Sequence, residues 1–242
     1  MKYICLMLYF ISSIVSAKNI DSSKWKAWIP SGWKLIHSSE GDLNKDGKSD
    51  VILVIEENNA AKRQENDSLS APVLNFNPRN ILVLFKTADG YKRVARIKGF
   101  LPRENDPESY CLEDPFGFKN LKISRGLFKI ELNYWASCGG WGVSHETFTF
   151  RYEPIQRRFQ LIGLDTSSSS RNIGDNTDVS INYLTGRKKT STGINDFEET
   201  KPSDLKVLWE NMPKQPRFYL DKMSSDCSND GKTAQWCRYQ YE

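Results

Sequence analysis

The sequence has few histidines, little charge imbalance and, beyond its first residues, no long apolar run. Its 242 residues include two histidines, His37 and His145, which argues against a zinc site built on several histidine ligands. Thirty-four basic and thirty acidic residues leave a formal net charge of +4, too even for a dedicated nucleic-acid-binding protein. No stretch after residue 17 approaches the roughly 18 apolar residues that a membrane-spanning helix needs, so we expect no membrane span in the mature chain.

The sequence also lacks the short motifs of common catalytic sites. It has no GxSxG elbow, no GxxxxGK phosphate loop and no dinucleotide fingerprint, and His145-Glu146 lacks the second histidine of HExxH. We therefore predict no catalytic residue. Two enzymatic alternatives stay open: a thiol at Cys138 with His145 as its base, and a hydrolase with a dispersed acidic site. The densest acidic cluster, which we interpret as a solvated loop, comprises Asp106, Glu108, Glu113 and Asp114.

The first 17 residues have the pattern of a signal peptide. They read MKYICLMLYFISSIVSA, with Lys2 as the positive region and residues 3–15 as an apolar run. Val15 and Ala17 are small residues at the spacing that signal peptidase needs. We therefore expect cleavage after Ala17 and export of residues 18–242 to the periplasm or the extracellular space.

Four cysteines remain after removal of this leader: Cys111, Cys138, Cys227 and Cys237. In an exported chain, four cysteines indicate two disulfides, for which three pairings are possible. We favour Cys111–Cys138 and Cys227–Cys237, because each cysteine is then paired with its nearest neighbour in sequence. The second bridge would tie a short loop near the C-terminus.

The body of the chain is dominated by short apolar runs with turn signals between them. Residues 50–56 (DVILVIE) and 80–86 (NILVLFK) predict central strands buried on both faces, and residues 146–152 (ETFTFRY) alternate as a half-buried strand does. Eight to ten such strands at hairpin spacing predict a mainly β, antiparallel architecture over residues 18–200. A sandwich, an open barrel and partial propeller-like sheets stay open as alternatives.

The pattern changes in two later segments. Four consecutive serines, residues 167–170, predict a loop over residues 166–176. Residues 201–242 are interpreted as a C-terminal extension, in which Ser203 caps a short helix through Leu208 and Trp209. The disulfide-tied tail follows this helix.

One motif predicts metal chemistry. Residues 41–50 read GDLNKDGKSD, in which oxygen-bearing side chains alternate and Gly47 permits a sharp turn. Hard oxygen donors at this spacing suit Ca²⁺. The twelfth position is Leu53 instead of glutamate, so the loop enters a strand and is not an EF-hand; the alternative is a polar turn without metal. The predicted ligands are the side chains of Asp42, Asn44, Asp46 and Asp50 and the backbone carbonyl of Lys48.

This loop and the strand after it resemble the calcium loops of FG-GAP and VCBS-type repeats, found in integrin-like propellers and bacterial surface proteins. The resemblance implies calcium ligation by the same loop residues. A broader resemblance, over residues 25–192, is to an uncharacterised family of exported bacterial β-proteins. It is carried by the motifs IPSGWKLI, GDLNKDGKSD, NPRNILVLFK, NYWASCGGWG, FRYEPIQRRFQLIGLD and INYLTGR. It implies an exported β-protein with a calcium loop and no established reaction.

Two tryptophans next to a glycine pair are the candidate binding residues. Trp135 and Trp141 flank the sequence ASCGG, and they either fill the core or form an exposed recognition loop. The leading functional hypothesis is a non-enzymatic exported binding protein, in one version an inhibitor or immunity protein that neutralises a periplasm-acting toxin or hydrolase. The alternatives are a module that binds cell-wall glycan and the hydrolase named above.

Overall fold

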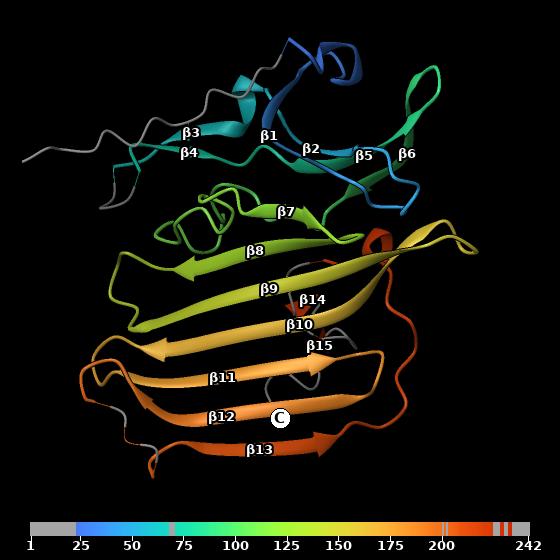
Figure 1. Cartoon of the computed structure of the whole chain (residues 1–242). Helices are drawn as coiled ribbons and strands as arrows, with labels where there is room; N and C mark the ends of the chain where they lie inside the picture. Colours follow the sequence, from blue (N-terminus) through green and yellow to red (C-terminus); the bar gives the residue numbers. More distant parts are fainter. Residues whose placement is uncertain are drawn as a thin grey trace, which may run out of the picture.

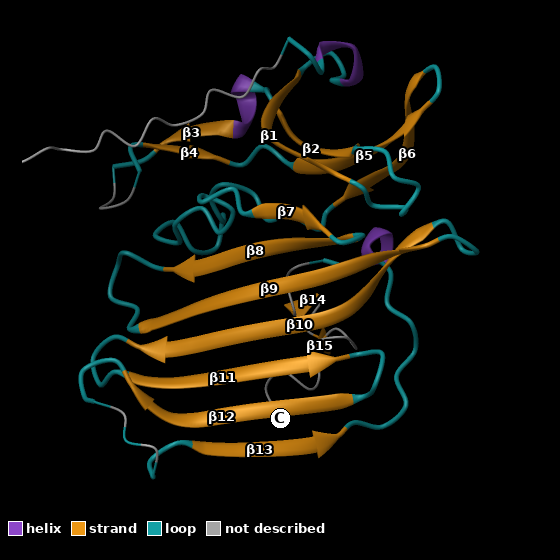
Figure 2. Ribbon diagram, viewed as in Figure 1, coloured by secondary structure: helices purple, strands orange, loops and turns teal. Residues whose placement is uncertain are grey.

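The computed structural model describes residues 23–67, 71–199, 201 and 203–224, and the backbone of Ser228–Asn229 and Lys232–Thr233. Almost all regular structure in these residues is strand (Figure 2). The strands are β1 (Trp33–Gly41), β2 (Asp50–Glu57), β3 (Arg63–Glu65), β4 (Val73–Asn75), β5 (Arg79–Thr87), β6 (Gly90–Lys98), β7 (Leu121–Ser124), β8 (Leu127–Trp135), β9 (Gly142–Glu153), β10 (Arg158–Ser170), β11 (Asp175–Asn182), β12 (Arg187–Asn195), β13 (Lys206–Asn211), β14 (Ser228–Asn229) and β15 (Lys232–Thr233). Three 3-10 turns accompany them: η1 (Lys26–Trp28), η2 (Ala60–Lys62) and η3 (Leu220–Lys222).

Two antiparallel sheets make up most of the molecule (Figure 1). The smaller has four strands in the order β1-β2-β5-β6, and the larger has seven in the order β13-β12-β11-β10-β9-β8-β7. Strands of the large sheet follow one another in chain order, and short connections join all of them except β12 and β13, which residues 196–205 link. The predicted mainly β, antiparallel class is confirmed, and neither sheet closes into a barrel within the described residues.

The sheets pack together through one apolar core. Ile52, Val54, Ile81, Val83 and Ile97 come from the small sheet, and the inner face of the large sheet supplies its aromatic side chains. Phe100, from the segment between the sheets, places its ring 5.2 Å from that of Phe148 and 5.6 Å from that of Phe150, both edge-on. The inner face is defined by buried residues of β8 to β11: Phe128, Ile130, Leu132, Phe148, Phe150, Leu161, Leu164, Val179 and Ile181.

The small sheet is buried on its second face as well. There, Val51, Leu53 and Leu82 pack with Trp25, which is 3% exposed, and with the partly buried Tyr91. The centres of the Trp25 and Tyr91 rings are 5.2 Å apart. Burial on both faces explains why β2 and β5 are continuous apolar runs in the sequence.

The edges of the two sheets meet where β1 lies beside β7. Gly41, at the end of β1, has no room for a side chain, because an added Cβ would come within 2.6 Å of the Ile123 Cγ2 atom on β7. Nearby, the Nε2 atom of His37 lies 3.4 Å from the backbone oxygen of Leu121. The 42–50 loop therefore starts at the junction of the two sheets.

A buried ion network closes the opposite end of the small sheet. The guanidinium of Arg79, 3% exposed, donates to Glu56 at 2.9 Å and to both oxygens of Asp114 at 2.6 and 2.8 Å. Glu56 also binds Lys34 Nζ at 2.8 Å and accepts from Asn75 at 3.0 Å. Burial alone raises the pKa of the Glu56 carboxyl, but hydrogen bonds from Lys34 and Arg79 outweigh it and hold that pKa below its ordinary value. The network thus ties the small sheet to the 99–120 segment.

The predicted C-terminal helix is wrong. Residues Lys206–Asn211 form β13, which pairs with β12 along six residues, and Leu208 and Trp209 lie in this strand. The β-branched and aromatic side chains of the segment suit a strand, and the ladder with β12 decides the outcome. The described residues beyond residue 200 contain 3-10 structure in place of an α-helix. The predicted bridge Cys227–Cys237 lies outside the described residues.

Replacing Arg79 should destabilise the protein strongly. The substitution Arg79→Met leaves the buried Glu56 and the partly buried Asp114 without their shared cation, and we expect a loss of about 3–5 kcal/mol in the free energy of unfolding. Urea denaturation measures this loss. The matched control is Lys62→Met, which removes the partner of Glu57 from a pair whose Lys side chain is 41% exposed; it should cost at most about 1 kcal/mol. Equal losses in the two variants would contradict the role assigned to the network.

Candidate functional site

The 42–50 loop is a tight turn held by its own polar side chains. Side-chain oxygens of Asp42, Asn44 and Asp46 accept hydrogen bonds from backbone N–H groups later in the loop, at 2.6–2.9 Å. Gly47 takes a positive φ of 81°, as the predicted sharp turn requires. Within the described residues, no three His, Cys, Asp or Glu side chains form a metal-binding cluster. Calcium at this loop stays a prediction.

Asp50 has a clear structural role. It is fully buried, and its two carboxylate oxygens accept backbone N–H groups of Leu43 at 2.9 Å, Asn44 at 3.3 Å and Lys86 at 2.9 Å. Burial raises the pKa of this carboxyl in spite of the three hydrogen bonds. Asp50 thereby joins the loop to β2 and to the end of β5.

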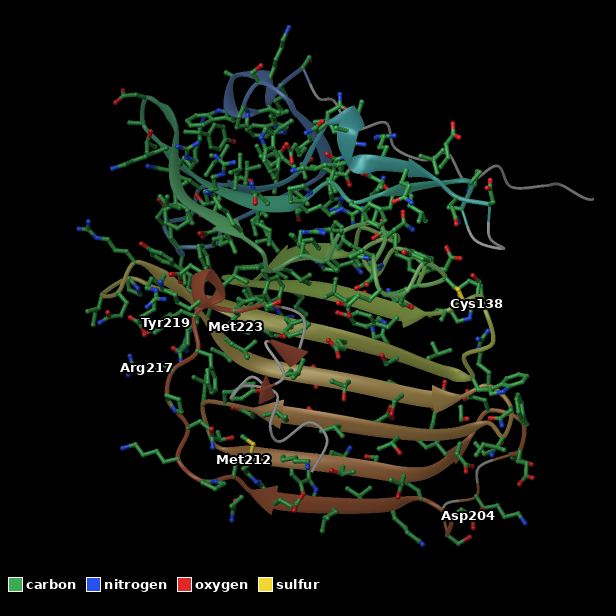
Figure 3. The ribbon with its side chains drawn as sticks, turned by 180° about the vertical axis from the view of Figure 1, so that it is seen from behind. Cys138, Asp204, Met212, Arg217, Tyr219 and Met223 are labelled. Atoms are coloured by element: carbon green, nitrogen blue, oxygen red, sulfur yellow. A yellow bond between two sulfur atoms is a disulfide. The ribbon has the colours of Figure 1, made fainter. Side chains whose placement is uncertain are left out.

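The two candidate binding tryptophans lie at one end of the large sheet. The β8–β9, β10–β11 and β12–β13 connections all lie at this end, on the left of Figure 1. We call residues 136–141, 171–174 and 196–199 the loop end. Figure 3, seen from behind, shows Cys138 and Asp204 there, and Met212 and Arg217 at the opposite end of the sheet. The large apolar side chains exposed at the loop end or beside it are Trp135 (39%), Trp141 (60%), Ile173 (55%) and Phe197 (64%).

The predicted disulfide Cys111–Cys138 is confirmed and holds the first of these loops. Its Cα atoms are 5.5 Å apart. The backbone N–H of Ser137 donates to the carbonyl of Cys111 at 2.9 Å, and Leu112 and Ala136 form an isolated bridge. Because Cys138 is consumed in the disulfide, it offers no thiolate, and the alternative of a Cys138 nucleophile is wrong.

Arg171 fastens the first loop to the second. Its backbone N–H donates to the carbonyl of Trp141 at 2.8 Å, and its guanidinium donates to the carbonyls of Ala136, at 3.0 Å, and Gly140. The same guanidinium lies 5.3 Å from the centre of the Trp135 ring, in a cation–π arrangement.

The second loop is fastened to the third in a similar way. The amide of Asn195 donates to the carbonyl of Ile173 at 2.8 Å, and the backbone N–H of Asp196 donates to that of Gly174 at 2.9 Å. A Cβ at Gly174 would lie 2.8 Å from the Phe197 ring, so the absence of a side chain lets Phe197 pack directly on the turn. All three loops are therefore cross-linked into one surface.

A groove of about 460 Å³ lies beside this surface. Tyr134 and Trp135 line it together with the hydroxyl groups of Ser144, Ser168 and Thr177. Asp175 also lines it, and its carboxylate accepts a hydrogen bond from the side-chain amide of Asn195 at 3.0 Å. The groove can hold a small polar ligand or a side chain of a partner.

The outer face of the large sheet, opposite the inner face, is polar. His145 lies there with its Nδ1 atom on the side-chain oxygen of Asn133 and its Nε2 atom 3.5 Å from the hydroxyl of Thr147. Ser167, Asp178 and Ser191 share its row across the strands, in a depression of about 220 Å³.

The acidic cluster of the 103–119 segment has structural partners. Asp106 accepts the backbone N–H groups of Glu108 at 2.7 Å and Ser109 at 3.2 Å, and Asp114 is bound to Arg79. Asp106 thus stabilises its own segment and Asp114 joins that segment to β5, so these two acids have structural roles and give no support to a dispersed acidic active site. Sequence reasoning missed Arg171, Ile173 and Phe197 as members of the loop end. The turn residues Gly174 and Asn195 indicate that turns lie close to these three residues. They do not indicate which turns lie side by side, because that depends on strand pairing.

No match was found in comparisons with protein-family models, with curated proteins or with solved structures. The likeness of the 42–50 loop to FG-GAP and VCBS-type repeats therefore stays a prediction from the sequence. None of the helical segments among the described residues is long and apolar enough to cross a membrane. The interpretation of the loop end depends on its own geometry.

Removing the bridge with Cys111→Ser and Cys138→Ser should lower stability and free the loop end. A disulfide across a sequence separation of 27 contributes about 2–4 kcal/mol to the free energy of unfolding. Chemical denaturation measures the loss, and hydrogen exchange should show faster exchange at Ser137 and Arg171, whose amides are bonded across the loop. Unchanged stability together with unchanged exchange would show that the bridge does not hold this surface.

Proposed function

We propose that the protein is an exported, non-enzymatic binding protein that recognises a protein partner through its loop end. In its specific form, it is an inhibitor or immunity-type protein that neutralises a toxin or hydrolase acting in the periplasm. One observation carries the proposal: large apolar side chains from separate loops are exposed together, with Trp141 60% and Phe197 64% exposed. Clustered apolar side chains on a soluble domain are typical of interaction surfaces, and tryptophan is frequent among the residues that dominate binding energy.

The rigidity of the loop end supports this function. A disulfide, the Arg171 contacts and the Asn195 amide fix three loops before any partner binds. A surface that is already ordered loses less conformational entropy on association, so more of the contact energy becomes affinity. The disulfide also suits an oxidising compartment outside the cytoplasm, which agrees with the signal peptide expected in the first 17 residues.

A glycan-binding module is the second candidate, favoured by the groove beside Trp135. Its aromatic rings and hydroxyl groups are suited to stacking on a sugar and bonding its hydroxyls. The apolar side chains that extend beyond the groove, Trp141, Ile173 and Phe197, are more than a sugar chain needs. This excess favours the protein partner.

The substitution Trp141→Ala should weaken partner binding at least tenfold, which corresponds to about 1.4 kcal/mol. The purified protein serves as bait for periplasmic extract, and the affinity for each captured protein is then measured by calorimetry. The matched control is Ile155→Ala in the β9–β10 turn, 85% exposed at the other end of the sheet, which should bind as the unsubstituted protein does. Captured proteins that bind both variants equally well would contradict the assignment. Binding of soluble peptidoglycan fragments, with loss in Trp141→Ala, would establish the glycan alternative instead.

We also propose that the 42–50 loop binds calcium. Asp42, Asn44, Asp46 and the carbonyl of Lys48 offer the hard oxygen that this ion prefers. Asp50, the fifth predicted ligand, is fully buried and already accepts three backbone N–H groups, so it would act by holding the loop in place. Asp46 is exposed, and a carboxylate oxygen that accepts one hydrogen bond keeps a second lone pair for a cation. Bound calcium would supply charge neutralisation where this loop meets both sheets, and its role would be structural.

Calcium should raise the melting temperature, and Asp46→Ala should remove most of that rise. An ion that binds the folded state alone adds about 2.7 kcal/mol at one hundred times its dissociation constant. Thermal unfolding in calcium and in chelator measures the difference. Asp89→Ala, in the exposed β5–β6 turn, is the control that should keep the full shift. A melting temperature that does not respond to calcium would overturn the metal assignment and leave the partner proposal unaffected.

A further inference from the structure

The last strand of the large sheet has a free edge. Strand β13 pairs with β12 and, within the described residues, with no strand on its other side. All six of its residues are exposed, including Val207 (44%), Leu208 (57%) and Trp209 (54%). An exposed apolar edge strand is a template for pairing with another strand, which proteins usually block.

The hydrogen-bond ladder shows which backbone groups are free. The N–H of Met212 donates to the carbonyl of Gly186 at 2.7 Å, just beyond the pair formed by Arg187 and Asn211. Hydrogen-bonded pairs alternate along an antiparallel ladder. Lys206, Leu208 and Glu210 therefore direct their backbone groups toward β12, and Val207 and Trp209 direct theirs outward.

A second β13 strand fits this edge in one register. Residues whose backbone groups point outward must pair with such residues of the second copy. This condition allows a two-fold axis at Val207, Leu208 or Trp209. With the axis at Leu208, the two leucines face each other, and Val207 lies opposite Trp209 of the second copy. Lys206 then lies opposite Glu210 of the second copy, twice across the axis. An axis at Val207 would place Lys206 opposite Leu208 and Glu210 opposite the like charge of Asp204. An axis at Trp209 would place Lys206 opposite Met212 and Glu210 opposite Leu208. Charge complementarity therefore selects the axis at Leu208.

The small sheet provides a contrast. Its edge strand β6 carries Lys92, Arg93, Arg96 and Lys98, all of one sign. Two copies of β6 would repel each other, which is a common protection of an edge. Strand β13 has a positive and a negative residue four positions apart on one face, and this arrangement attracts a copy of itself.

We propose that two copies of this chain associate through β13, antiparallel and with Leu208 on the two-fold axis, so that their large sheets join into one continuous sheet. The pairing satisfies the outward backbone groups of Val207 and Trp209 and covers their side chains. The loop end lies at one end of each sheet and stays accessible. The inference does not depend on the proposed partner binding or on calcium.

Sedimentation and light scattering of the purified protein test the proposal. The expected result is a dimer at about 100 µM that Leu208→Lys converts to a monomer. Ile155→Lys, at an apolar residue outside the edge that is 85% exposed, should remain dimeric. A monomeric unsubstituted protein, or a dimer that survives Leu208→Lys, would overturn the proposal.

Charge exchange then tests the register. Lys206→Glu and Glu210→Lys should each be monomeric, because each homodimer would contain two like-charge pairs, but a mixture of the two should dimerise. Glu210 also lies 3.6 Å from Lys188 in its own chain, so the melting temperature of each variant is measured first. If Glu210→Lys does not fold, cross-linking decides: Leu208→Cys should form an intermolecular disulfide much faster than Val207→Cys. Equal rates, or a mixture that stays monomeric with both variants folded, would exclude this register.

Discussion

The apolar contact between a four-stranded and a seven-stranded sheet is the constraint on which the molecule depends. Four strands cannot cover seven, so the buried hydrophobic residues of the large sheet come from β7 to β11, and among the described residues β12 and β13 contribute none. The large sheet therefore extends beyond the core (Figure 1). The exposed loops and the free edge lie on or next to this extension.

Much of the small sheet could be predicted from the sequence. The runs at residues 50–56 and 80–86 are apolar at nearly every position because both faces of β2 and β5 are covered. The disulfide was also predictable, since Cys111 and Cys138 are near neighbours in an otherwise cysteine-poor body. Local sequence was sufficient in these cases, because a continuous apolar run indicates burial on both faces and a pair of nearby cysteines indicates a closed loop.

The misses share a cause, which is hydrogen bonding to a neighbouring strand. Serines 167–170 were expected in a loop, but they belong to β10, where they pair with β9 on one side and largely with β11 on the other. Leu208 and Trp209 were expected in a helix, but β12 provides a ladder for them. The loop end was half predicted: Trp135 and Trp141 were identified, whereas Ile173 and Phe197 become their neighbours through strand order alone.

Rigidity in this protein comes from different interactions at different places. The interior depends on interlocked phenylalanine rings and on Arg79, whose charge is matched by Glu56 and Asp114. The loop end contributes no buried hydrophobic residue to the core, and a covalent bridge and the carbonyl contacts of Arg171 hold it instead. Such contacts hold the backbone and leave the side chains of Trp141 and Phe197 in solvent. A surface that is fixed in backbone and free in side chain is suited to recognition, because its apolar groups lose water only when a partner arrives.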